Sequence, residues 1–338
     1  MRASKPPRRP VRHPVMVVAL ATGMFWLMLA VAGGMIRALP VDTSADRFLD
    51  TRAHVARSLY WLCTDVGRRD QMIVLGASGA SAYKPADRAA LAPTVDQHLI
   101  HLPGTRASEL AIVVDLLANC LAPERAARTR LAVASLYAVY LPPFKPTDLL
   151  TLPRHLAATG AFVEGAEGWQ LAPRYADPST GGVMRFLMRP VMAGRLLLGN
   201  LDRYVTRRQM GAVEQQIDRA AARATLIRQV AADSGNPEAD PEAAFTQLAQ
   251  ALERWRSRGG QVVLVQSPVA GEVLRAVPAM AMWPRSERAL AARHGVAAID
   301  LVHSADDDEF RDGFHARDSA AMLWTERLMR LLDQKPDQ

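Results

Sequence analysis

The chain has 338 residues, a formal net charge of +7 and 22% charged residues. Its arginines are spread along the sequence without a basic block or interleaved aromatic residues, so nucleic-acid binding has little support. Beyond the first apolar stretch about 300 residues remain, which is enough for one large domain or for one domain with an insertion.

An uncharged segment at residues 14–36 is the first predicted element. As a helix it would be about 34 Å long, and the hydrocarbon core of a bilayer is about 30 Å thick. Basic residues precede it and aspartates follow it, which is typical of a cytoplasmic N-terminus. The sequence therefore predicts a cytoplasmic tail at 1–13, a transmembrane anchor at 14–36 and an extracytoplasmic body. A cleaved signal peptide is the alternative, because Ala30-Val31-Ala32 fits a cleavage site.

Beyond a connecting helix at 37–66, short apolar runs alternate with helical patterns, which predicts a parallel sheet covered by helices on both faces. Residues 144–243 interrupt the alternation and are predicted to form a helical insertion. The body is thus an α/β domain of three layers (α/β/α) at 67–143 and 244–334. Strands are expected at 71–75, 98–102, 131–141, 261–266 and 296–301. Helices are expected at 44–66, 84–97, 108–120, 241–258, 285–294 and 319–332.

The two cysteines, Cys63 and Cys120, allow two interpretations. Their apolar flanks favour two separate buried thiols. An extracytoplasmic compartment is oxidising and would also permit a disulfide. A metal site is not expected, because no histidine cluster accompanies the two cysteines.

The strand-like run Ile73–Leu75 continues into the turn Gly76-Ala77-Ser78-Gly79. A serine on a tight turn after a buried strand presents its hydroxyl to a ligand, and it becomes nucleophilic when a base lies beside it. The alternative is a serine that only caps the following helix.

Near the other end of the chain, Asp312 stands three residues before His315. The histidine can accept the proton of Ser78, and the aspartate can orient the imidazole. The alternative is a surface histidine beside an ordinary acidic loop residue. The other candidate bases are His98, His101, His294 and His303, of which His294 is expected to interact with the C-terminal end of its helix.

A tetrahedral intermediate also needs donors for its oxyanion. We expect them to be the backbone N–H of Ser78 and that of Gly104, because glycine allows a close approach of the backbone. Ser78, Gly104 and the 312–315 loop all follow predicted strands. In open parallel sheets, ligands bind at the carboxyl ends of the strands. The sequence therefore predicts one active site at that edge.

Three blocks of the chain resemble the SGNH (GDSL-like) hydrolase superfamily, and its membrane-anchored DltD-like branch in particular. They are Leu75-Gly76-Ala77-Ser78, Gly104, and Asp312 with His315 before the last helix. The resemblance covers residues 67–143 and 244–334. It implies that Ser78 is the nucleophile, and that Asp312 and His315 complete a catalytic triad.

One block of that superfamily is missing from the chain. An asparagine that donates to the oxyanion usually follows the third strand, and here Tyr137–Pro142 contains none. Asn200 is a substitute within the insertion, or else a residue on a helix surface. The resemblance implies a site with fewer oxyanion donors and favours acyl transfer over fast hydrolysis.

Three functions follow as expectations. The first is an extracytoplasmic O-acyltransferase of the bacterial inner membrane. It would take an acetyl or D-alanyl group from a membrane-embedded O-acyltransferase of the MBOAT type and pass it to a cell-envelope polysaccharide or another polymer. The second is an esterase or deacylase that uses the same residues with water. The third is a non-catalytic anchored subunit that binds polymer or acts as a scaffold. The sequence contains no sign of a metal, a nucleotide or an organic cofactor.

Overall fold

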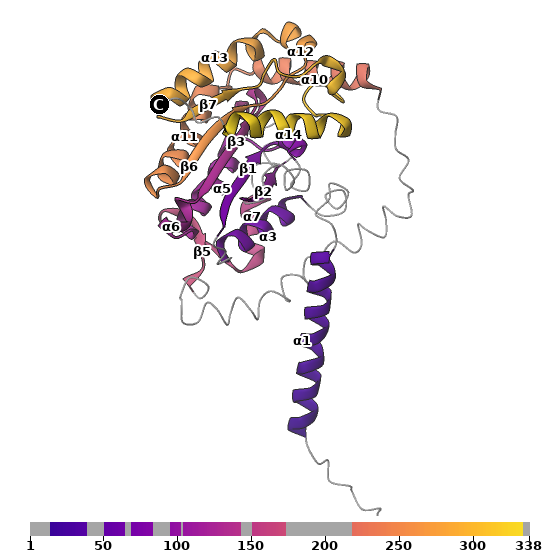
Figure 1. Ribbon diagram of the computed structural model, residues 1–338, viewed down its shortest axis with the longest axis vertical. Coiled ribbons are helices and arrows are strands. Elements are labelled where there is room, and N and C mark those ends of the chain that lie inside the picture. Colours follow the sequence, from indigo (N-terminus) through magenta and orange to yellow (C-terminus); the bar gives the residue numbers. More distant parts are fainter. Residues whose placement is uncertain are drawn as a thin grey trace, which may run out of the picture.

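Five parallel strands form the sheet at the centre of the body, in the order β2-β1-β3-β6-β7 (Figure 1). The computed structural model describes residues 14–38, 51–64, 69–83, 95–102, 104–142, 151–173 and 218–333. The strands are β1 (Asp70–Gly76), β2 (Val95–His101), β3 (Thr129–Ser135), β6 (Gln261–Gln266) and β7 (Ala297–Asp300). The central strands are apolar and buried, as expected for a sheet covered on both faces.

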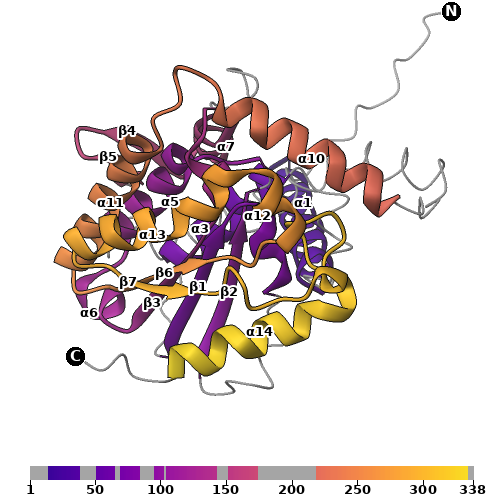
Figure 2. The same ribbon diagram turned by 90° about the horizontal axis from the view of Figure 1, so that it is seen from above.

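Helices cover both faces of this sheet (Figure 2). On one face lie α5 (Ala107–Cys120), α11 (Pro241–Ser257) and α13 (Pro278–Arg293), and on the other lies α14 (Asp318–Asp333). The other helices in the described part of the body are α3 (Thr51–Thr64), α6 (Pro123–Ala126), α7 (Thr151–Thr159), α10 (Arg219–Ser234) and α12 (Gly271–Ala276). Short 3-10 helices are η1 (Ser78–Ala82), η2 (Tyr137–Tyr140) and η4 (Asp307–Glu309). The α/β architecture expected from the sequence is confirmed.

Helix α11 shows how local sequence sets the bounds of an element. The Asp240 side chain accepts a hydrogen bond from the Ala243 N–H, which caps the first turn just before Pro241. At the other end Gly259 has a φ of +88°, a conformation that glycine adopts readily. The chain can therefore leave the helix and enter β6 within a few residues.

The third strand is shorter than the sequence predicted. The apolar run at 131–141 suggested one strand, but β3 ends at Ser135 and the chain turns into η2. The ring of Trp283 explains the turn, because its centroid lies 5.6 Å from that of Tyr137 and 5.1 Å from that of Tyr140. A straight strand would point these two tyrosines to different sides. The helix expected at 84–97 is wrong at its end, since residues 95–97 belong to β2, and 84–94 lie outside the described residues.

The predicted helical insertion contains a β-hairpin, so that prediction is wrong at residues 162–171. β4 (Phe162–Gly165) pairs with β5 (Gly168–Leu171) in antiparallel fashion. The hairpin is held against α5, because the Asn119 Nδ2 atom donates to the carbonyl oxygens of Glu167 (3.1 Å) and Trp169 (3.2 Å). Strands of four residues are too short to show an alternating pattern in the sequence. Residues 174–217 of the insertion, including Asn200, lie outside the described residues.

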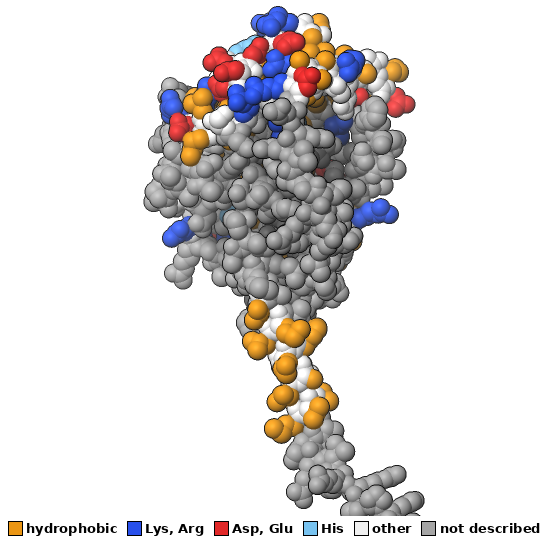
Figure 3. All heavy atoms as spheres, turned by 90° about the vertical axis from the view of Figure 1, so that its right-hand side faces the viewer, with side chains coloured by type: hydrophobic (Ala, Val, Ile, Leu, Met, Phe, Trp, Pro, Cys, Tyr) orange, Lys and Arg blue, Asp and Glu red, His pale blue; other side chains and the backbone are white. Residues whose placement is uncertain are grey.

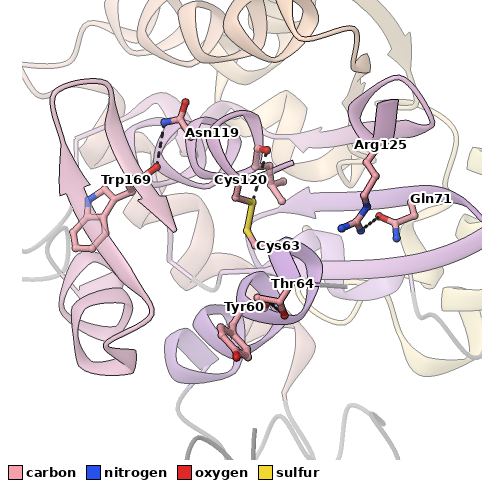
Figure 4. Close-up of a disulfide and its surroundings, with 9 residues drawn as sticks. Tyr60, Cys63, Thr64, Gln71, Asn119, Cys120, Arg125 and Trp169 are labelled. Carbon is pink, nitrogen blue, oxygen red and sulfur yellow. Dashed lines mark hydrogen bonds between the residues drawn. A yellow bond between two sulfur atoms is a disulfide. The ribbon is translucent and has the colours of Figure 1, made fainter. Parts of the chain in front are cut away.

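A disulfide joins Cys63 of α3 to Cys120 of α5 (Figure 4). The interpretation as two separate buried thiols is therefore wrong. The apolar flanks that suggested free thiols belong to two helices that pack together, which brings the Cα atoms to 5.3 Å. The bond closes a loop with a sequence separation of 57 residues and so restricts the unfolded chain.

The segment predicted as a membrane anchor is helical, as α1 (Pro14–Ala38). Apart from the partly buried Trp26, its described large apolar side chains are exposed, including Met16, Leu20, Phe25 and Leu27. Figure 3 shows hydrophobic side chains along the described part of this helix. Among the helices in the described part of the chain, none meets the combined length and hydropathy of a membrane span. The anchor at 14–36 stays a prediction.

Candidate active site

Ser78 lies at the carboxyl end of β1, where the strand turns into η1. Ala77 still has extended backbone angles (φ −72°, ψ −168°), and Ser78 begins the 3-10 helix. The turn needs a glycine before it. A Cβ atom on Gly76 would lie 2.7 Å from the Ala134 carbonyl oxygen and 2.9 Å from the Ala80 side chain. Gly76 therefore lets η1 fold back closely over the sheet edge and presents Ser78 there.

Asp312 and His315 form a hydrogen-bonded pair in the loop before α14. The His315 Nδ1 atom lies 2.7 Å from Asp312 Oδ2. The other carboxylate oxygen, Oδ1, accepts the backbone N–H groups of Phe314 (3.1 Å) and His315 (3.0 Å). Both carboxylate oxygens are thus occupied within the loop, and the imidazole is left with Nε2 to offer to a reacting group.

The environment keeps Asp312 ionised. Burial alone would raise its pKa, but the hydrogen bond and the charge of His315, together with the two backbone N–H groups, lower the pKa to about 2. At neutral pH the carboxylate is therefore charged. It can fix the imidazole orientation and stabilise an imidazolium, as the third member of a triad does.

The candidate catalytic loop, residues 309–317, is tied at its base. Arg311 N donates to the His315 carbonyl (2.8 Å), and Arg317 N donates to the Glu309 carbonyl (2.8 Å). The Glu309 side chain then anchors this base to α14. It accepts two bonds from the guanidinium of Arg327 (2.8 and 2.9 Å) and one from Trp324 Nε1 (2.8 Å).

The structure brings the segment with Ser78 against the segment with His315. A Cβ atom built on Gly79 would lie 3.7 Å from the Phe314 carbonyl oxygen, so the two segments lie side by side. Helix α14 also packs on η1, and Thr325 Oγ1 donates to the Ala82 carbonyl (3.3 Å). Among the described residues no hydrogen bond joins Ser78 Oγ to the imidazole; such bonds commonly tighten only when substrate binds.

Gly104 follows β2 at the same sheet edge. Leu102 N donates to the Gly76 carbonyl (2.9 Å), which places the chain after β2 beside the chain after β1. Gly104 has a φ of +71° and is exposed. Within the described residues, neither the Ser78 N–H nor the Gly104 N–H donates a hydrogen bond. Both are available as the oxyanion donors that the sequence suggested.

Of the rival histidines, His101 lies at the same sheet edge: it is buried and pairs with Gly76, two residues before Ser78. The ring of His294, at the end of α13, pairs with Glu253 (2.7 Å between Nδ1 and Oε1). His98 and His101 belong to β2, and His303 is exposed after β7. Sequence reasoning missed one group at the site edge, the buried Glu287 of α13. Its spacing of four residues from Trp283 on a largely apolar helix face was the available signal.

No protein-family model matches the chain, and no curated protein matches it in sequence. Within the described part, no group of three or more His, Cys, Asp or Glu side chains is placed to hold a metal ion.

Proposed function

We propose that this protein is a membrane-anchored, extracytoplasmic O-acyltransferase that works through Ser78, His315 and Asp312. It would belong to the SGNH-type enzymes and resemble their DltD-like branch. The observation that carries the proposal is the Asp312–His315 pair (2.7 Å) in a loop that lies beside the Ser78–Gly79 turn.

The mechanism has two halves. The Ser78 Oγ attacks the carbonyl carbon of the acyl donor while His315 Nε2 takes the hydroxyl proton. The Ser78 and Gly104 N–H groups hold the oxyanion. The intermediate expels the donor alcohol, which receives the proton from His315, and an acyl ester of Ser78 remains. An acceptor hydroxyl then gives its proton to His315 and attacks the ester, which frees Ser78 and acylates the acceptor.

The donor and acceptor follow from the expected location. A membrane-embedded O-acyltransferase of the MBOAT type would supply an acetyl or D-alanyl group, and a cell-envelope polysaccharide would accept it. The predicted anchor would keep the site near the inner membrane on its outer side. The Cys63–Cys120 disulfide supports this compartment, because disulfides persist in oxidising surroundings.

The test is acylation of the full chain in detergent by p-nitrophenyl acetate. We expect a burst of p-nitrophenolate with an amplitude set by the enzyme concentration, and an acetyl group on the peptide that contains Ser78. Ser78→Ala should abolish the burst. Ser81→Ala, in the same 3-10 helix, is the matched control. A Ser78→Ala variant that retains the burst would contradict the proposal.

An esterase is the second candidate, because the His315 side chain is 22% exposed and water can reach it. The two functions differ in how the acyl-enzyme breaks down. With an alcohol added, a transferase should form mainly the new ester, whereas an esterase should release mainly the free acid. If Ser78→Ala and His315→Ala both left envelope acylation intact in cells, the non-catalytic scaffold would replace both.

A further inference from the structure

A small cavity lies where β3 and β6 end, beneath η2 and α13. Its volume is about 10 Å³, which is about the space that one water molecule requires. Apolar and polar side chains share the wall. The lining residues are Ser135, Leu136, Tyr137, Gln266, Ser267, Val269, Met280, Trp283, Pro284, Glu287 and Val302.

Glu287 provides a buried carboxylate in this wall and is only 1% exposed. The Tyr140 hydroxyl donates to Oε1 (2.6 Å) and Gln266 Nε2 donates to Oε2 (2.8 Å). A carboxylate has about four lone-pair positions, and the Ser135 hydroxyl is a third partner of this one, so at least one position stays free to accept a hydrogen bond. Burial raises the pKa of Glu287, although these donors oppose the shift.

Trp283 faces the same cavity with an unused donor. The residue is 7% exposed, and within the described region its indole Nε1–H has no hydrogen-bond partner. The ring is fixed between Tyr137 and Tyr140. A buried donor without an acceptor destabilises the folded state, because its hydrogen bond to water is lost and not replaced. An occupant with an acceptor atom would remove that destabilisation.

The cavity is close to the candidate nucleophile. Gly76 of β1 pairs with Ala134 of β3, so Ser78 and Ser135 leave neighbouring strands at the same edge. Neighbouring strands are about 4.8 Å apart. On the other side, Ala270 N donates to the Gly313 carbonyl (3.0 Å), which links the segment after β6 to the candidate catalytic loop.

We propose that this cavity is a subsite for one hydroxyl group of the acyl acceptor, next to the hydroxyl that is acylated. The Trp283 Nε1–H donates a hydrogen bond to the hydroxyl oxygen, and the hydroxyl group donates a hydrogen bond to the Glu287 carboxylate. A hydroxyl is water-sized and is both donor and acceptor, which matches the two groups on the wall; a methyl group would leave the indole unpaired. The acceptor class is therefore a polyhydroxylated polymer. This inference rests on the proposed function for the role of the bound group.

The first test follows binding without catalysis. The full chain in detergent is labelled with ¹⁵N-tryptophan, and Trp283→Phe assigns one of the six indole resonances. Ethylene glycol should shift the Trp283 resonance in a saturable manner. The control compound, 1,2-dimethoxyethane, has the same skeleton without hydroxyl protons and should not. Equal shifts with both compounds, or none, would overturn the hydroxyl subsite and leave the cavity with a structural water.

The second test separates the subsite from the chemistry. Transfer of acetyl from p-nitrophenyl acetate to ethylene glycol is measured as acceptor KM, and burst kinetics give the acylation rate of Ser78. Trp283→Phe should raise the acceptor KM about tenfold, as expected for one lost hydrogen bond, and change acylation much less. Trp169→Phe, in the β4–β5 hairpin, is the matched control. An unchanged acceptor KM refutes the subsite, whereas absent acylation in the wild-type protein refutes the proposed function.

Discussion

The candidate catalytic loop and the Glu287 cavity lie at the same sheet edge, yet the pKa values of their carboxyl groups shift in opposite directions. The pKa of Asp312 falls to about 2 because the imidazole and two backbone N–H groups overcome burial. The pKa of Glu287 rises because burial outweighs its neutral hydrogen-bond donors, Tyr140 and Gln266, and the charge of Arg288 nearby. At Asp312 the adjacent imidazole and two backbone N–H groups outweigh the effect of burial on the pKa, whereas at the more deeply buried Glu287 the hydrogen-bond donors do not.

The substitution with the largest expected effect on this contrast between Asp312 and Glu287 is Asp312→Asn. The amide keeps the size of the side chain but loses its charge and can favour the wrong imidazole tautomer. The rate of Ser78 acylation should fall by on the order of 10⁴-fold. Burst kinetics with p-nitrophenyl acetate measure it, and Asp308→Asn, an exposed neighbour, should stay close to wild type. A loss below about tenfold would mean that Asp312 does not orient the base.

Removing the disulfide tests whether the candidate site at the sheet edge depends on the overall stability of the domain. Replacing both Cys63 and Cys120 by Ser should lower the free energy of unfolding by about 2–4 kcal/mol. Urea denaturation measures this loss. Because the bond joins α3 to α5, away from the loop, Ser78 acylation at low temperature should persist. Equal stability of the variant and the wild type would show that the bond adds nothing to the native state.

Glu309→Gln tests whether the ion pair with Arg327 anchors the candidate catalytic loop to α14. Glu309 is ionised, because hydrogen bonds from Arg327 and Trp324 lower its pKa against the opposing effect of burial. The variant leaves the half-buried Arg327 without its charged partner, so unfolding should cost about 1–2 kcal/mol less. Glu326→Gln, one residue before Arg327, is the control for denaturant unfolding. If both variants lose the same stability, the ion pair does not anchor the loop.

The smallest expected effect is a difference in pH dependence. Asp312 has a lowered pKa, so its contribution to stability is present above about pH 4 and is lost as the pH falls towards 2. Glu287 has a raised pKa, so its contribution is present below about pH 4 and is lost as the pH rises through the folded-state value. Plots of unfolding free energy against pH should therefore flatten below about pH 4 in Asp312→Asn and above about pH 4 in Glu287→Gln. If the slope of stability against pH changed in the same direction in both variants, the opposite pKa shifts of Asp312 and Glu287 would be refuted.

The regular part of the fold could be predicted from the sequence because it depends on local patterns. The run Gln261–Gln266 is apolar between turn residues, and β6 has those same bounds. Helix α11 begins at a capping aspartate followed by proline and ends before a glycine. The spacing of Asp312 and His315 is likewise local, because the two residues are three positions apart along the chain, and this was enough to predict that they pair.

Other features depended on contacts between distant segments. Whether Cys63 and Cys120 are bridged was decided by the packing of α3 on α5, and the end of β3 was decided by the ring of Trp283. The β4–β5 hairpin was too short to leave a pattern and is held by Asn119. The contact of Gly79 with Phe314, which brings the serine segment to the histidine segment, joins residues more than 230 positions apart.

The sequence by itself determined the residue types of the site and the strands that carry them, because hydrophobic periodicity, caps and turn residues act over a few positions. Only the tertiary structure decided which of those residues meet. The order of the strands and the burial of Glu287 beside Trp283 arise from packing across the sheet edge, where neighbours in space are far apart along the chain.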